Sequence, residues 1–148
     1  SDFLQKLSAI YRYILQNKDT ETVTLSQELA FVKNYVNLQK SRFEEGLQVN
    51  ITIEEKYMLS EIVPVTLQNL FENAIKHNTI EEDKPLIIEV YIEDEQLIVK
   101  NNIQKKKFVE TSNKQGLDSL KTLYKYLSTT PVETLETETE FIVKVPLL

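Results

Sequence analysis

The stretch LFENAIKHN, residues 70–78, gathers two asparagines, a glutamate, a lysine and the only histidine of the chain. Asparagine is a poor choice for a helix interior, because its side chain competes for backbone hydrogen bonds. On a helix, Asn69, Asn73 and Lys76 would fall at i, i+4 and i+7 and share one face. Two amide oxygens with a cation one turn further on suit a hard cation and phosphate groups.

The same face also fits a simpler interpretation. Glu72 and Lys76 are four residues apart, and such a pair on a solvated helix contributes a few tenths of a kcal/mol. A lone histidine on a helix, such as His77, is most often a surface or capping side chain. The spacing alone therefore leaves both a binding face and a solvated face open.

Composition excludes several classes of site. The net charge of −6 over 148 residues argues against general nucleic-acid binding, although Lys105–Lys107 form a local basic cluster typical of a solvated loop. Cysteine is absent, which excludes disulfides and thiolate metal sites. The only glycines are Gly46 and Gly116, so neither GxGxxG nor GxxxxGK[ST] is present. A nucleotide would therefore have to be bound by a motif other than a glycine-rich loop.

The start of the chain carries no obvious targeting segment. Residues 1–16 are amphipathic at helical spacing, so we expect no signal peptide, and no run of about 18 apolar residues predicts a membrane span. The start at Ser1, without methionine, suggests a fragment of a longer protein.

Hydrophobic periodicity predicts the elements that position these residues. Helices are expected over residues 2–16 and about 25–43, the second with Ser26 as its N-cap and Gly46 in a left-handed C-terminal cap. A strand, a helix after Pro64, a hairpin turning at residues 93–95, a helix from Gly116 and two final strands follow. This order predicts an α+β fold, with a mixed sheet covered on one face by helices and preceded by a helical segment.

Two motifs resemble those of LytS-type sensor histidine kinases. LQNLFENAIKH resembles the N-box of these kinases, which have the Bergerat ATP-binding fold, and residues 26–43, SQELAFVKNYVNLQKSRF, resemble the segment that precedes their ATP-binding domain. The resemblance covers nearly the whole chain. It implies a Bergerat-type two-layer sandwich over residues 46–148. Residues 1–45 would be the end of the dimerisation hairpin and a linker.

The resemblance also implies roles for residues on the N-box helix. Asn73 would coordinate Mg²⁺, Asn69 would be the second N-box asparagine, and Lys76 and His77 would reach toward the phosphates of ATP. Glu72 would polarise the attacking group.

Two later motifs depart from the family pattern. The family has Asp-x-Gly-x-Gly after a strand, where the aspartate accepts a hydrogen bond from adenine, but here Asn101 stands for the aspartate and Ile103 and Lys105 for the glycines. The lid motif Gly-x-Gly-Leu keeps Gly116 and Leu117, with Lys114 in place of its first glycine. ATP would lie between the helix at residues 69–78, the turn at Asn101 and the loop at residues 111–117.

The implied function is that of a protein-histidine kinase with ATP and Mg²⁺ as cofactors. It would pass the γ-phosphoryl group to a histidine outside this chain and then to a response regulator. The full protein would be a homodimer through its dimerisation helices, anchored in a bacterial plasma membrane by segments absent here, with this part in the cytoplasm. One alternative is a non-catalytic docking module that binds nucleotide weakly or not at all. Another is an unrelated α+β interaction domain.

Overall fold

The computed structural model describes residues 2–17, 21–107 and 114–148, apart from the side chains of Ile14, Lys114 and Gln115. The predicted order of helices and strands is confirmed. Beyond it, the chain forms two short 3-10 helices and a two-stranded sheet that periodicity did not predict. The elements are α1 (Asp2–Asn17), β1 (Val23–Thr24), α2 (Leu25–Phe43), η1 (Glu44–Gly46), β2 (Leu47–Thr52), η2 (Glu55–Tyr57), β3 (Glu61–Ile62), α3 (Thr66–His77), β4 (Leu86–Glu93), β5 (Gln96–Asn102), α4 (Lys114–Leu127), β6 (Glu133–Glu136) and β7 (Glu140–Pro146).

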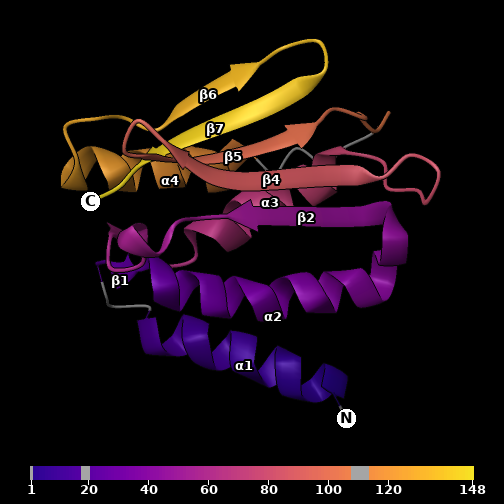
Figure 1. Ribbon diagram of the computed structural model, residues 1–148, viewed down its shortest axis with the longest axis horizontal. Coiled ribbons are helices and arrows are strands. Elements are labelled where there is room, and N and C mark those ends of the chain that lie inside the picture. The colour runs from indigo at the N-terminus through magenta and orange to yellow at the C-terminus, as the bar shows by residue number, and fades with distance from the viewer. Residues whose placement is uncertain (1, 18–20, 108–113) are drawn as a thin grey trace.

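The main sheet has five strands in the order β2-β4-β5-β7-β6. Strand β2 runs parallel to β4, and the other neighbours are antiparallel. Along β4, Leu86, Ile88 and Val90 alternate into the core, as expected for a sheet with one covered face. Helices α3 and α4 lie behind the sheet in Figure 1, while α2 runs beside β2. The α+β two-layer prediction is therefore confirmed.

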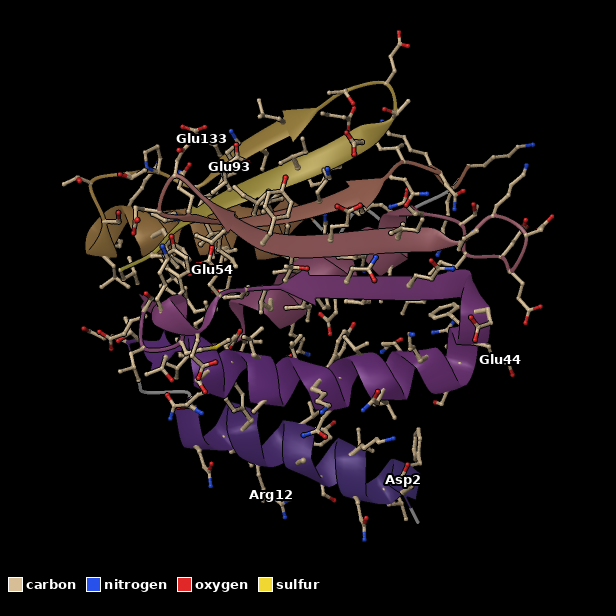
Figure 2. All side chains as sticks on the ribbon, in the orientation of Figure 1. Asp2, Arg12, Glu44, Glu54, Glu93 and Glu133 are labelled. Atoms are coloured by element: carbon tan, nitrogen blue, oxygen red, sulfur yellow. The ribbon has the colours of Figure 1, made fainter. Side chains whose placement is uncertain are left out.

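The ends of α2 differ from the sequence prediction. Thr24 is the N-cap instead of Ser26, because its hydroxyl accepts a hydrogen bond from Gln27 N at 3.2 Å while the Gln27 side chain accepts one from Thr24 N at 3.0 Å. At the other end, Glu44 has the positive φ of 51°, and Figure 2 shows it at the corner where α2 gives way to β2. The predicted left-handed cap at Gly46 is wrong. Gly46 instead lies in close packing, since a Cβ there would lie 3.1 Å from Ile80 Cγ2.

Helix α1 packs against α2 and joins the main core. The Tyr13 and Phe31 rings stack with centroids 4.0 Å apart, and Ile10 is buried in the same cluster as the sheet residues. The opposite side of α1 carries exposed apolar side chains, and Figure 2 shows Arg12 on the side away from α2. These exposed side chains are Phe3, Leu4, Tyr11 and Leu15. Within the described ranges, no helix has the length and apolarity needed to cross a bilayer.

Candidate functional site

A cavity of about 630 Å³ opens between α3, the end of β5, the start of α4 and the β6–β7 hairpin. Helix α3 reaches it with its C-terminal half, and the segment after β5 forms another wall. The described residues that line it are Asn73, Ala74, His77, Asn78, Asn101, Ile103, Lys105, Lys106, Leu117, Asp118, Glu136 and Phe141. Sequence motifs that lie far apart in the chain therefore meet at one place.

The helix α3 presents Asn73 to this cavity because its apolar residues are committed elsewhere. Leu67, Leu70 and Phe71 are buried in the core, which turns the polar face outward. Among the residues that the structure describes, none makes a hydrogen bond with the side-chain amide of Asn73. The amide of Asn69, one turn earlier, is likewise uncommitted within the described ranges, although Asn69 is not among the described lining residues.

Two further residues of α3, Glu72 and Lys76, lie outside the described wall of the cavity. Both are exposed. Glu72 Oε1 accepts a hydrogen bond from Gln68 Nε2 at 3.0 Å. Burial raises the pKa of Tyr35 on α2, and the charge of Glu72 raises it further, which places Glu72 on the side of α3 toward α2. The structure thus separates Glu72 from Asn73 by the turn of the helix.

His77 lies at the cavity wall among lysines. Its pKa is lowered below the ordinary value of 6.5, first by partial burial and then by the positive charges of Lys76, Lys106 and Lys105. The imidazole is therefore neutral at pH 7, in a neighbourhood that favours an anion.

Asn101 is placed in the cavity, although not at a turn as predicted. It belongs to β5, opposite Ile88 of β4 and Phe141 of β7, and only 5% of it is exposed. Its Nδ2 donates to the carbonyl of Asn102 at 2.7 Å. Across the described parts of the chain, Oδ1 of Asn101 accepts no hydrogen bond, so this atom remains able to accept one from a ligand.

The segment after β5 needs no glycine in this chain. Neither Ile103 nor Lys105 has a positive φ. The segment is instead clamped to the end of α3, where Asn78 Oδ1 accepts from Gln104 N at 2.7 Å and the His77 carbonyl accepts from Lys106 N at 3.1 Å. This role of Asn78 was not predicted from the sequence. Asn78 is buried and also donates to the Ala74 carbonyl at 2.8 Å.

The structure describes only part of the lid motif. Leu117 lines the cavity, and Gly116 is exposed, with open space where a Cβ would lie. Helix α4 begins at Lys114, two residues before the predicted start. The Lys114 side chain is not among those that the structure describes. Residues 111–113 of the predicted ATP-binding loop also fall outside the described residues.

Several charged groups in the wall were missed by sequence reasoning. Asp118 and Glu136 face the cavity, and Lys105 Nζ lies 3.2 Å from Glu136 Oε2. Glu136 comes from β6, so no local pattern relates it to the N-box. The described residues contain no group of three or more His, Cys, Asp or Glu that could hold a metal ion. A metal at Asn73 would therefore need oxygen ligands from a bound molecule.

Comparison with known proteins relates the chain to one group. A family model described as histidine kinase matches residues 1–47. The sensor histidine kinase BtsS of Escherichia coli is 40% identical over 79 residues, which is 53% of this chain and 14% of that protein. The sensor histidine kinase/phosphatase LytS of Staphylococcus aureus is 38% identical over 76 residues, 51% of this chain and 13% of that protein. Over about half of its length, the chain is thus similar to sensor histidine kinases.

Solved structures of histidine kinases share its fold. The cytoplasmic segment of histidine kinase QseC has a TM-score of 0.58 at 18% identity, covering 86% of this chain and 76% of that one. The catalytic domain of histidine kinase ThkA has a TM-score of 0.53 at 15% identity, covering 84% and 94%. The α+β architecture is thus that of histidine kinase catalytic domains, while the matched stretch spans only about a seventh of the curated relatives' length.

Proposed function

We propose that this chain is the ATP-binding catalytic part of a LytS-type sensor histidine kinase. Residues 46–148 would be the ATP-binding domain, and residues 1–45 the end of the dimerisation hairpin and its linker. The observation that carries the proposal is the side-chain amide of Asn73, uncommitted among the described residues, in a cavity whose wall also holds His77 and two lysines.

Each end of the cavity would take a different part of ATP. Oδ1 of Asn101 would accept a hydrogen bond from the adenine amino group, with Leu117 and Phe141 supplying apolar surface. His77, with Lys105 and Lys106, would lie on the phosphate side. Gly116 and Lys114 would contribute from the start of α4, since the N-terminus of a helix favours an anion.

The amide of Asn73 fits a hard cation as an oxygen ligand, with phosphate oxygens completing the set. Mg²⁺ bound in this way would neutralise phosphate charge. Asn69 and Lys76 would support the same face of α3, and Glu72, exposed beside it, would polarise the attacking imidazole. The γ-phosphate P–O bond to ADP would break as a bond to the nitrogen of a histidine outside this chain forms.

The whole protein would extend this reaction to a signalling pathway. An aspartate of a response regulator would take the phosphoryl group from the histidine. The exposed apolar side chains of α1 would belong to a homodimer interface made with the dimerisation helices. We further propose that this part works in the cytoplasm of a bacterium and that segments outside this chain anchor the protein in the plasma membrane.

A second candidate function is a docking module without catalysis. The ion pair between Lys105 and Glu136 engages one cation of the wall, and Asp118 adds a negative charge to it. Both features disfavour a bound polyphosphate.

Calorimetric titration of ATP, with and without Mg²⁺, separates the two functions. The proposal predicts Mg²⁺-dependent binding that Asn73→Ala abolishes. Asn50→Ala, which changes an exposed asparagine of β2, is the matched control and should bind like the unmutated chain. Absence of binding by the unmutated chain would favour the docking module.

A further inference from the structure

The carboxylate of Glu28 joins three helices at the start of α3. Glu28 belongs to α2 and is completely buried. Its Oε2 accepts hydrogen bonds from the Tyr13 hydroxyl of α1 and from Val65 N at 3.2 Å, and its Oε1 accepts from Leu67 N at 3.1 Å. One side chain of α2 thus connects α1 to the first turn of the helix that carries the N-box.

These hydrogen bonds explain why a carboxylate is tolerated there. Removing a charged group from water is costly unless it is well paired. The first N–H groups of a helix have no partner within the helix, and the helix dipole favours a negative charge beside them. Val65 itself has no side-chain cap to offer, so Glu28 serves as the cap of α3 from a different helix.

The backbone at Val65 is strained in the arrangement that Glu28 supports. Its φ of 69° is left-handed, which is unfavourable for a β-branched residue. Such a conformation persists only where the surroundings enforce it. A negative φ would relieve this strain, and the hydrogen bond from Val65 N to Glu28 Oε2 is one contact that holds the left-handed conformation in place.

The strained residue is directly connected to the candidate site. The Val65 carbonyl accepts the first hydrogen bond of α3, from Asn69 N at 3.0 Å. Asn73 follows one turn later and lines the cavity. A change at Val65 would therefore alter the start of α3 and the direction in which both amides point.

We propose that Tyr13 and Glu28 are positioning residues that form a latch. Through their hydrogen bond, the placement of α1 sets the conformation of Val65 and the orientation of Asn69 and Asn73. A movement of α1 that withdraws the Tyr13 hydroxyl weakens the hold of Glu28 on the first turn of α3 and lowers the affinity for nucleotide. The inference rests on the proposed function, because it assigns the latch to the nucleotide site.

Tyr13→Phe is the variant that opens the latch most gently. It removes the hydroxyl and keeps the ring that stacks on Phe31. Glu28→Gln is a harsher change, since it places an amide donor among three donors and risks misfolding. Tyr11→Phe controls for the loss of an exposed hydroxyl on the same helix, and Ile10→Val loosens the packing of α1 without touching the latch.

Two measurements on the whole chain test the latch. Tyr13→Phe should speed amide hydrogen exchange at Val65, Leu67 and Asn69 and weaken Mg²⁺–ATP binding by about 2- to 30-fold, the range for residues that couple sites without contacting a ligand. Tyr11→Phe should change neither quantity. Ile10→Val should lower the melting temperature and leave ATP affinity unchanged.

The results that overturn the latch differ from those that overturn the kinase. If Tyr13→Phe and Ile10→Val both weaken ATP binding, each in proportion to its loss of stability, then Tyr13 has only a structural role. Unchanged exchange in α3 upon Tyr13→Phe would also reject the latch. If the unmutated chain binds no ATP, the proposed function fails, and the exchange comparison still decides whether α1 controls α3.

Discussion

At the residue scale, Asn101 differs most informatively from its relatives' motif. Its Nδ2 donates to the Asn102 carbonyl at 2.7 Å in a site that is 5% exposed. Asn101→Asp would place a carboxylate oxygen against that carbonyl instead. We expect the free energy of unfolding to fall by about 1–3 kcal/mol, the cost of burying unpaired polar groups.

Urea unfolding measures this effect, with Asn50→Asp as the control at an exposed site. An Asn101→Asp chain as stable as the unmutated one would contradict the amide orientation described for Asn101.

His77 offers a spectroscopic test, because it is the only histidine in the chain. Its folded pKa lies below 6.5, so the folded state binds fewer protons than the unfolded state. The free energy of unfolding should therefore decrease as the pH falls through 6.5 toward the folded pKa, and be constant above that window. NMR titration of the imidazole gives the folded pKa directly.

Added Mg²⁺–ATP should raise the pKa of His77 if the phosphates lie beside it. A pKa above 6.5 in the free chain would contradict the lowered pKa expected for His77.

At the scale of elements, the β4–β5 hairpin carries avoidable strain. Its two-residue turn, Asp94 and Glu95, has φ values of 53° and 60°. Type I′ turns with this geometry favour Asp-Gly, since glycine adopts positive φ without cost. Glu95→Gly should raise the free energy of unfolding by about 1 kcal/mol. Thermal unfolding checks this, with Glu138→Gly at an exposed position without positive φ as the control, for which we expect no gain.

The elements themselves were largely predictable because their patterns are local. The alternation along β4 and the apolar face of α3 both predicted the observed structure. The cap of α2 was misplaced by two residues, since Thr24 and Ser26 are chemically similar and only the geometry of Gln27 distinguishes them. Gly46 was misjudged because its role depends on contact with Ile80, which is distant in sequence.

At the scale of the whole molecule, local sequence patterns do not predict which distant segments lie next to one another. The N-box pattern predicted Asn73 and His77 as site residues, and both line the cavity. Nothing local marks Glu136 or Phe141 as their neighbours. Glu28 is the clearest case: an acid on a helix ordinarily faces solvent, and only the packing of α2 against the start of α3 makes it a buried cap.

The central claim is that the cavity between α3, β5 and α4 is a nucleotide site. The most direct measurement is a ¹H–¹⁵N NMR titration of the chain with Mg²⁺–ATP that follows the side-chain amides of Asn73 and Asn101. We predict saturable shifts of both amides, with those of Asn17 and Asn50 unmoved. Shifts elsewhere that leave Asn73 and Asn101 unchanged, or no shifts at all, would contradict the account.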